Sequence, residues 1–320
     1  MKTRTLGALR VSAIGVGCMG MSHAAGAPMD ADEAIRVIRD AVDMGYTLFD
    51  TAKNYGFADA PHHNEELLGR ALAGIRDKVV ISTKCGVDFD YAADRDAPPI
   101  LRDSSRESIR ASVEGSLRRL RTDHIDLYLQ ARTDPNTPPE DVAETMAELI
   151  REGKVLHWGI SEVDETYLRR AHAVCPVTAV ENAYNMVRRE HEALAPFLEE
   201  NHIGWIAHGP LCKSLLSGAF HKGVTFGRND WRGHFVNDEN LDKYQPLLQY
   251  LETLARERDV TTGAVSLAWI LHQKPYIVPI PGMRSRTRLE ENAKAADISL
   301  TAAELAEIDA LVRCQGQITA

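Results

Sequence analysis

Short apolar segments of strand length alternate with amphipathic helical stretches along almost the whole chain. Eight such segments occur, and most lack a strict alternation of apolar and polar residues, which is typical of parallel strands covered on both faces. They span residues 13–16, 47–49, 79–82, 125–129, 156–160, 177–180, 204–207 and 276–280. Because eight strand–helix units in 320 residues fit a closed barrel, we predict an α/β fold of the (β/α)₈, or TIM-barrel, type.

Further features complete the predicted architecture. Residues 3–11 read as a β-hairpin that turns at Gly7. Residues 85–103 and 212–240 do not fit the alternation, and we expect them to be extra loops on the C-terminal face, where barrel enzymes keep their sites. Since the chain shows no linker and no repeat beyond the strand–helix units, residues 1–320 are expected to form one domain.

Two helix starts are also predicted from capping patterns. Asp30 is followed three residues later by Glu33, and Ser104 is followed in the same way by Glu107. In a capping box the first residue of such a pair accepts a backbone N–H, and the glutamate side chain returns the bond. We therefore expect helices to begin directly after Asp30 and Ser104.

The composition narrows the range of partners. Acidic residues outnumber basic residues by 46 to 37, and no run of like charge is long enough to suggest a nucleic-acid-binding tail. No stretch approaches the length of an apolar membrane span, and the N-terminus lacks the pattern of a secretion signal. Five widely spaced cysteines without a C-x-x-C pair argue against disulfides and structural zinc. We expect a soluble cytoplasmic protein without a metal, and its oligomeric state has no sequence signature.

Polar residues follow the predicted strands, where a barrel would bring them to one rim. Asp50 and Tyr55 follow the second strand, and Lys84 follows the third. An ammonium group beside a phenol favours the phenolate, so Lys84 is expected to lower the pKa of Tyr55 and prepare it for acid–base chemistry. From spacing alone, an equally good reading is that Asp50 and Lys84 only form an ion pair that closes the barrel mouth.

A series of motifs along the chain resembles the aldo-keto reductases, in particular the bacterial and plant NADP-dependent branch that is also similar to potassium-channel β-subunits. The motifs lie at residues 17–20, 50–56, 64–71, 82–84, 125–128, 151–155, 159–162 and 280–292. The resemblance implies a (β/α)₈ barrel that binds NADP(H) across its C-terminal face. It also implies a catalytic tetrad of Asp, Tyr, Lys and His, of which Asp50, Tyr55 and Lys84 match three members.

The fourth member does not match. Where the family has its catalytic histidine, this chain has Ala131, which cannot donate a hydrogen bond from its side chain. Three more rim positions depart from the family pattern: Glu181 replaces a glutamine that contacts the nicotinamide carboxamide, His208 replaces a tyrosine that stacks on the nicotinamide, and Gly209 replaces a serine. We interpret these changes as a natural re-tuning of the site, in which His208 is the best candidate to replace the missing donor. An equally good reading is that His208 is a neutral ring that only stacks on the nicotinamide.

The resemblance assigns sixteen positions to the nucleotide, and all except Glu181 and His208 keep the family pattern. They are Gly17, Cys18, Met19, Ser161, Glu162, Glu181, His208, Leu211, Lys213, Gly218, Gly282, Met283, Arg284, Arg288, Glu291 and Asn292. Arg284 and Arg288 offer guanidinium donors suited to the 2′-phosphate that distinguishes NADP from NAD. Residues 15–20 also satisfy G-x-G-x-x-G, but the next helix signal is ten residues on, so we do not expect a dinucleotide-binding fold there.

The sequence thus predicts an NADP(H)-dependent oxidoreductase that transfers hydride between the nicotinamide and a carbonyl or alcohol substrate. Tyr55 would be the acid and base, Lys84 would tune its pKa, and Asp50 would orient Lys84. Two alternatives stay open: a redox-neutral lyase or epimerase with tightly bound NADP, and an NADP-sensing binding protein with weak turnover. The small-molecule substrate is not readable, because the two long loops would suit a polyol, a sugar or an aromatic ketone equally.

Overall fold

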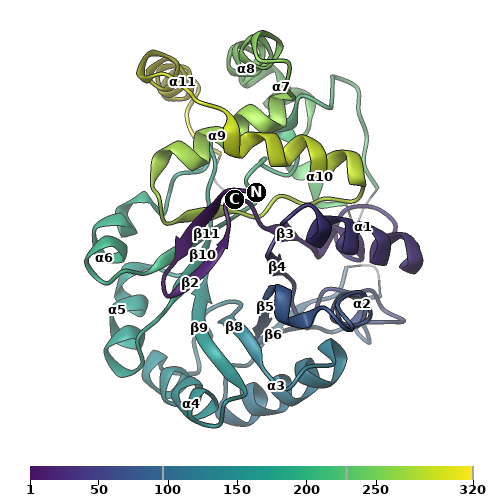
Figure 1. Ribbon diagram of the computed structural model, residues 1–320, viewed down its shortest axis with the longest axis vertical. Coiled ribbons are helices and arrows are strands. Elements are labelled where there is room, and N and C mark those ends of the chain that lie inside the picture. Colours follow the sequence, from purple (N-terminus) through teal and green to yellow (C-terminus); the bar gives the residue numbers. More distant parts are fainter. Residues whose placement is uncertain (96, 228–229, 319–320) are drawn as a thin grey trace.

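Eight parallel strands form the central sheet of the protein (Figure 1). The computed structural model describes residues 1–95, 97–227 and 230–318. The strands are β3 (Val16–Gly17), β4 (Leu48–Asp50), β5 (Val80–Cys85), β8 (Ile125–Gln130), β9 (Val155–Ser161), β10 (Ala179–Ala183), β11 (Gly204–His208) and β12 (Ile277–Pro279). Each overlaps one of the eight apolar segments, so the predicted barrel is confirmed. Residues 96, 228 and 229, in the two predicted loops, and 319–320, at the end of the predicted domain, lie outside the described residues.

The first and last strands of the sheet close the barrel through a glycine-containing segment. The backbone N–H groups of Gly15 and Gly17 donate to the carbonyl oxygens of Pro279 and Pro281, at 2.9 and 3.0 Å. A Cβ atom at Gly17 would lie 2.7 Å from the carbonyl oxygen of Ile280, which is closer than a side chain can approach. Gly15 and Gly17, which belong to the G-x-G-x-x-G match at residues 15–20, therefore serve to close the barrel.

Helices surround the sheet (Figure 1). They are α1 (Ala31–Asp43), α2 (His63–Ala71), α3 (Arg106–Leu120), α4 (Pro139–Arg151), α5 (Glu165–Val174), α6 (Ala195–Glu200), α7 (Asp238–Lys243), α8 (Gln245–Glu257), α9 (Thr262–Gln273), α10 (Arg286–Ala293) and α11 (Ala302–Gln315). Short 3₁₀ helices are η1 (Met19–Met21), η2 (Arg76–Lys78), η3 (Glu192–Leu194), η4 (Leu215–Ser217), η5 (Trp231–His234) and η6 (Lys294–Asp297). Helix α8 packs on both α9 and α11, which gives this side of the barrel a second helical layer.

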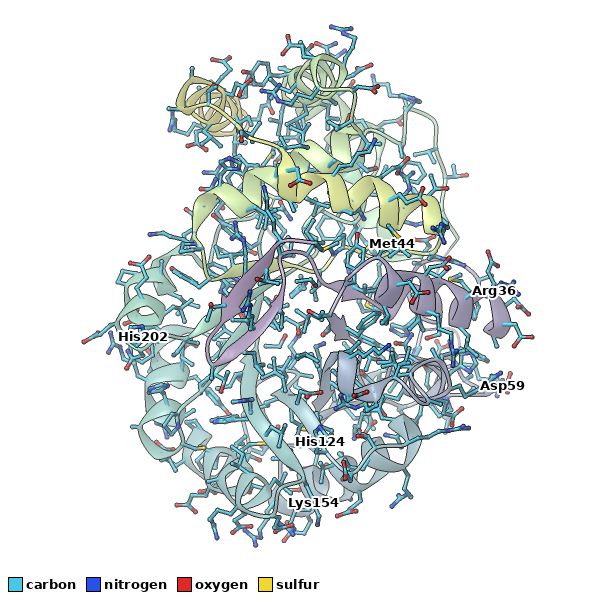
Figure 2. All side chains as sticks on the ribbon, in the orientation of Figure 1. Arg36, Met44, Asp59, His124, Lys154 and His202 are labelled. Carbon is cyan, nitrogen blue, oxygen red and sulfur yellow. The ribbon has the colours of Figure 1, made fainter. Side chains whose placement is uncertain are left out.

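Helix α1 shows why these segments fold as helices against the sheet. Its buried residues, Ala34, Val37, Ile38 and Ala41, recur at three- and four-residue spacing and so lie on one face. Arg36, on the other face, is exposed and projects from the outer edge of the molecule (Figure 2). Burial of the apolar face, rather than helix propensity, is what fixes such a helix in place.

The predicted hairpin plugs the N-terminal end of the barrel. It consists of β1 (Thr3–Leu6) and β2 (Leu9–Ser12), joined by a turn in which Gly7 has a φ of +59°. Leu6 is fully buried and packs with apolar residues that point into the barrel from its strands. With this end closed, the opposite, C-terminal rim is the open end, as the position of the two long loops predicts.

Two local predictions need correction. Helix α3 is capped by Ser105, whose side chain accepts the N–H of Ser108, rather than by Ser104. Ser104 is instead occupied by a bond from its N–H to Asp134 (2.9 Å) and by Gln130, which donates to its hydroxyl (2.9 Å). The loop at 85–103 contains a second hairpin, β6 (Val87–Phe89) and β7 (Ile100–Arg102), so it is more ordered than the sequence indicates.

All five cysteines are free thiols, and four of them are buried. In the part of the chain that the structure describes, no helix is long and apolar enough to cross a membrane.

Candidate active site

The inward-facing side chains of the barrel strands change from apolar to polar toward the C-terminal rim. Because alternate residues of a strand face the same side, Asp50 follows Leu48 on the inner face of β4, and Lys84 follows Ser82 on that of β5. Leu48 is part of the barrel's apolar interior, whereas Asp50, Ser82 and Lys84 are buried polar groups. The strand period therefore brings the predicted residues together at the rim.

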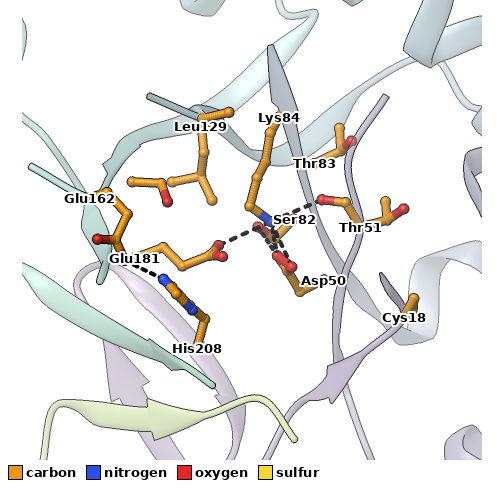
Figure 3. A network of polar contacts seen from close by, with 12 residues as sticks. Cys18, Asp50, Thr51, Ser82, Thr83, Lys84, Leu129, Glu162, Glu181 and His208 are labelled. Atoms are coloured by element: carbon orange, nitrogen blue, oxygen red, sulfur yellow. Dashed lines mark hydrogen bonds and ion pairs between the residues drawn. The ribbon is translucent and has the colours of Figure 1, made fainter. Parts of the chain in front are cut away.

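Lys84 forms the centre of this polar cluster (Figure 3). Its ammonium group donates to both carboxylate oxygens of Asp50, with a distance of 2.6 Å to Oδ1, and to the carbonyl oxygen of Thr51 at 3.0 Å. Burial alone would lower the pKa of Lys84, but the carboxylates of Asp50 and Glu181 outweigh burial and raise it. Lys84 is thus a permanent cation whose three hydrogens are all engaged.

Glu181 is a second carboxylate beside the same ammonium group. Its Oε2 lies 3.1 Å from Nζ of Lys84 but makes no hydrogen bond within the described residues, because Asp50 and Thr51 take the lysine hydrogens. Burial and the neighbouring Asp50 raise the pKa of Glu181 to about 8, against the opposite effect of Lys84. At neutral pH the site therefore favours a protonated Glu181, which resembles the glutamine expected at this position in shape and charge.

Tyr55 lies beside this cluster, with its ring centroid 5.5 Å from Nζ of Lys84. Burial raises the pKa of Tyr55 to about 12. Lys84 lowers this pKa, as predicted, but burial outweighs its effect, and the carboxylates of Asp50 and Glu181 also oppose it, so the pKa is raised overall. The phenol therefore carries its proton at neutral pH, which suits a group that donates a proton.

A buried asparagine fixes the segment that carries Tyr55. Asn64, at the start of α2, accepts a bond from the hydroxyl of Thr51 (2.7 Å) and donates to the carbonyl oxygen of Cys18 (2.9 Å) and to the hydroxyl of Ser22 (2.7 Å). The backbone N–H of Asn64 also donates to the carbonyl oxygen of Tyr55 at 3.0 Å. One side chain thus ties the loop after β4 to the loop after β3, and so positions the phenol.

Ala131 lies directly after β8, where the family pattern has its histidine, and is nearly buried. It continues the inward-facing series of Leu127 and Leu129, so a side chain at this position faces the barrel mouth. The next residue, Arg132, donates to the carbonyl oxygen of Ala131 (2.6 Å) and to the hydroxyl of Ser161 (3.3 Å). Arg132 was not given a role from sequence, and its charge lowers the pKa of Tyr55.

His208 and Glu162 form a second pair at the rim (Figure 3). Nε2 of His208 is hydrogen-bonded to Oε1 of Glu162, and His191 lies on the other carboxylate oxygen at 3.6 Å. Burial would raise the pKa of Glu162, but the two histidines outweigh it and lower this pKa, so Glu162 is ionised. Burial lowers the pKa of His208 despite Glu162. A neutral ring that donates from Nε2 has only a lone pair at Nδ1, so His208 presents an acceptor rather than the predicted replacement donor.

The segment after β11 has an unusual backbone. Three consecutive residues other than glycine, Cys212, Lys213 and Ser214, have positive φ angles of 46°, 50° and 82°. Such conformations are strained for L-residues and concentrate at functional sites. Gly218, also predicted to contact the nucleotide, has a φ of +70°, and a Cβ there would lie 2.9 Å from the hydroxyl of Thr262. Leu211 immediately precedes this segment and packs against the core.

The predicted adenosine-side residues lie on α10 and in the turn before it. Arg284 donates to the carbonyl oxygens of Ala25 and Ala27, at 2.6 and 2.8 Å, so it holds the loop after η1. Arg288 is half-exposed and paired with Glu291 at 2.7 Å. Of the two arginines, Arg288 is therefore the one that can turn toward an added phosphate with the loss of only one surface ion pair, which is worth little.

The remaining predicted nucleotide residues differ in exposure. Gly17 and Gly282 face each other across the barrel closure, and a Cβ added at Gly282 would have only the carbonyl oxygen of Gly17 near it, at 4.0 Å. Gly282 thus leaves open space. Three further residues are buried, and they are Cys18, Met283 and Asn292. Met19, which begins η1, is partly exposed.

One residue near the phenol was missed in the sequence analysis. His23 lies in the irregular loop after η1, and its ring is stacked on that of Tyr55, with centroids 5.8 Å apart and planes at 14°. Trp231, in the second long loop, lies edge-on to the same histidine at 5.6 Å. Neither strand period nor helix spacing marks an irregular loop, so no pattern available in the sequence could have placed His23.

Replacement of Glu181 by glutamine should change how stability depends on pH. A folded-state pKa of about 8, against an ordinary value of 4.5, means that the folded protein holds a proton that the unfolded chain releases. The free energy of unfolding of the wild type should therefore fall as pH rises between these values, and Glu181→Gln should remove this fall. We expect the variant to gain roughly 1–3 kcal/mol relative to the wild type between pH 5 and pH 8 in urea titrations. The exposed carboxylate of Glu200 provides the control Glu200→Gln, and an equal gain in that variant would refute the assignment.

A buried ion pair with a phenol at the carboxyl rim of a barrel is the kind of arrangement that barrel enzymes use for chemistry. Comparison with known proteins names the family. The profile of the Aldo/keto reductase family matches residues 13–313. A probable aldo-keto reductase 1 from Glycine max is 36% identical over 304 residues, which cover 93% of this chain and 84% of the relative.

Solved structures agree with this match. The structure of the glycerol dehydrogenase AKR11B4 from Gluconobacter oxydans superimposes with a TM-score of 0.87 at 30% identity and covers 99% of this chain and 97% of that one. An aldo/keto reductase from Klebsiella pneumoniae, in complex with NADP and acetate, has a TM-score of 0.74 at 26% identity and covers 100% and 98%. The chain therefore belongs to the aldo/keto reductase family and is an NADP(H)-dependent oxidoreductase.

Proposed function

We propose that the protein transfers hydride between NADP(H) and a small carbonyl or alcohol substrate at a site with one donor fewer than the family pattern. The observation that carries this proposal is the buried ammonium group of Lys84, held by Asp50 5.5 Å from the Tyr55 ring. Residues 1–320 are proposed to act as one domain, which agrees with a family match over residues 13–313.

Each residue of the cluster has a proposed task. The phenol of Tyr55, which carries its proton at neutral pH, would give that proton to the carbonyl oxygen during reduction and take it back during oxidation. Lys84 would stabilise the phenolate that forms, because its charge favours the deprotonated phenol. Asp50 would keep Lys84 in place through its two hydrogen bonds. Burial of all three keeps water from competing with the substrate.

The rim fits the proposed cofactor. When bound, NADPH supplies the hydride. The buried Oε2 of Glu181 has no hydrogen-bond partner in the described residues, and the neutral acid can both donate to and accept from an amide. The left-handed backbone at 212–214 and the half-exposed Arg288 are further features that suit a polyanionic ligand. Lys213 adds a positive charge beside that backbone.

A second candidate function follows from Glu181. A carboxylate in place of an amide would favour a cationic, oxidised nicotinamide and would help to hold NADP tightly. This would suit a redox-neutral lyase or epimerase that oxidises its substrate only transiently. We rank this function second, because the pKa of about 8 keeps Glu181 mostly neutral near pH 7.

The stoichiometry of the reaction separates the candidates. The purified protein would be incubated with NADPH and a panel of aldehydes, ketones and hydroxy-carbonyl compounds, and NADPH absorbance would be followed together with product mass. One NADPH consumed per alcohol formed supports the proposed function. Product without net NADPH consumption would replace it with the redox-neutral function, and nucleotide binding without product would favour a sensing role.

Replacement of Arg288 by glutamine should weaken NADPH binding and leave NADH binding nearly unchanged. The guanidinium group of Arg288 can offer charge-assisted hydrogen bonds to a 2′-phosphate, which NADH lacks. We expect a loss of roughly tenfold to a hundredfold in NADPH affinity by isothermal titration calorimetry. Arg286→Gln is the matched control, because Arg286 lies on the same helix but is paired with Asp40 and Glu290. Equal losses for both nucleotides would exclude a phosphate-binding role.

A further inference from the structure

The loop that follows η1 is fixed firmly beside the proposed acid. The hydroxyl of Ser22 donates to the carbonyl oxygen of Tyr55 at 3.2 Å, and Asn64 donates to the same hydroxyl at 2.7 Å. The next residue, His23, bonds through Nδ1 to the carbonyl oxygen of Gly56 at 2.9 Å. The carbonyl oxygens of Tyr55 and Gly56 are therefore both bonded to this loop, and the imidazole ring has a defined orientation next to the phenol.

The hydrogen bond to Gly56 fixes the protonation of the imidazole. A carbonyl oxygen only accepts, so Nδ1 of His23 must carry the hydrogen. Burial lowers the pKa of His23, and the positive charge of Lys213 lowers it further, against the effect of the bond to Gly56. The ring is therefore neutral near pH 7, and its Nε2 carries a lone pair on the side of the ring away from Gly56.

That lone pair is buried and has no partner within the described residues. The His23 ring is surrounded by aromatic rings from three segments: Tyr55 at 5.8 Å, Phe89 at 5.1 Å and Trp231 at 5.6 Å between centroids. The hydroxyl of Tyr91 donates at 3.4 Å to the Gly56 oxygen that His23 also uses, so Tyr91 is tied to the same loop segment. None of the three rings that contact His23 meets its Nε2 with a hydrogen bond, so the acceptor stays unsatisfied beside these rings.

An unsatisfied buried acceptor destabilises the protein unless a water molecule or a ligand supplies the missing donor. We propose that His23 is a substrate-binding residue that accepts a hydrogen bond from a hydroxyl group of the substrate, so that the enzyme selects hydroxy-aldehydes and hydroxy-ketones over simple carbonyl compounds. This inference rests on the proposed function, since it places the reacting carbonyl at Tyr55.

The spacing and the missing histidine agree with this substrate class. The His23 and Tyr55 rings are nearly parallel, with centroids 5.8 Å apart, so a short substrate bound at the phenol would lie next to the imidazole. Ala131 provides no donor to the carbonyl, which makes substrate binding depend more on other contacts. An aromatic ketone without a hydroxyl would leave Nε2 of His23 unpaired, whereas a short sugar or the carbonyl form of a polyol would satisfy it.

The test compares 2-hydroxypropanal with propanal, which differ by one hydroxyl group. The ratio of their kcat/KM values would be measured with NADPH for the wild type, His23→Phe and Phe89→Leu. His23→Phe retains a ring but loses the acceptor, and we expect the ratio to fall about tenfold or more. Phe89→Leu alters the rings around His23 without touching a hydrogen bond, so it should change both substrates alike. His23→Gln, which keeps an acceptor of similar length, should restore part of the ratio.

The possible outcomes distinguish failure of this inference from failure of the proposed reductase function. A ratio that is the same in wild type and His23→Phe overturns the inference and leaves the reductase function standing. Failure of the wild type to oxidise NADPH with either aldehyde overturns both. Circular dichroism and NADPH affinity show whether His23→Phe folds. If it does not, the wild type is compared with His23→Gln and Phe89→Leu. A ratio near one in all three proteins, with propanal as good a substrate as 2-hydroxypropanal, overturns the inference.

Discussion

Replacement of Tyr55 by phenylalanine should abolish turnover while leaving NADPH binding within a few-fold of the wild type. The phenol is the only group of the Asp50–Tyr55–Lys84 cluster that can pass a proton to a carbonyl oxygen, since all three hydrogens of Lys84 are bonded to Asp50 and Thr51. A positioned acid contributes about 10²–10⁴-fold to a rate. Because this site lacks a second donor at Ala131, we expect the loss to lie toward the upper end of that range.

The measurement needs two readouts and a matched control. Initial rates of NADPH oxidation give the catalytic loss, and calorimetric titration with NADPH shows that the variant still folds and binds its cofactor. Tyr250→Phe, on the outer helix α8, removes a hydroxyl far from the rim and should leave both readouts unchanged. If Tyr55→Phe kept wild-type rates, the proton would come from another group and the proposed mechanism would fail.

The barrel was predictable because it depends on repeated, local patterns. Each apolar segment overlaps a strand, and the two-residue period of a strand is enough to carry Asp50 and Lys84 to the same rim. Capping is less predictable, since it depends on which serine is free. Ser104 is used by Asp134 and Gln130, so the neighbouring Ser105 caps α3 instead.

The electrostatics of the site were not predictable in the same way. Sequence spacing brings Lys84 and Tyr55 together and suggests a lowered pKa for the phenol, but the sign depends on burial and on the second carboxylate of Glu181. Likewise, the role of His208 depends on the hydrogen bond between its Nε2 and Glu162, which comes from a different strand end. The pKa of Tyr55 and the hydrogen bonding of His208 depend on burial and on charges from other strands and loops. A sequence pattern within one strand or helix does not show these effects.

Irregular segments account for the rest. His23 lies in a loop whose path is set by Ser22 and Asn64. Residues 212–214 have positive φ angles but include no glycine, so the sequence does not indicate this conformation. In both cases the conformation is imposed by tertiary contacts rather than by local preference. The same loops hold the groups that would recognise the substrate, which is why the family resemblance identifies the reaction class more readily than the substrate.

Introducing histidine at position 131 should raise activity on simple aldehydes by about 10²–10³-fold, the usual value of one hydrogen-bond donor to a developing oxyanion. Ala131 continues the inward-facing series of β8 and is 7% exposed, so a side chain there faces the mouth of the barrel. His208 does not supply this donor, since its neutral ring donates to Glu162 and presents only a lone pair elsewhere. Propanal, which brings no hydroxyl of its own, should gain most.

A control of similar bulk distinguishes hydrogen bonding from packing. Ala131→Leu fills the same space without a donor, so it should lower the rates of all substrates or leave them unchanged, whereas Ala131→His should raise kcat/KM for propanal. For 2-hydroxypropanal, kcat/KM should rise less or fall in Ala131→His. The proposed site already binds this substrate through His23, and the added imidazole would narrow the space available to it. Two results together would contradict this proposal: equal wild-type rates on propanal and 2-hydroxypropanal, and no gain in Ala131→His. Position 131 would then have no influence on the carbonyl, and the proposed re-tuning of this site would be wrong.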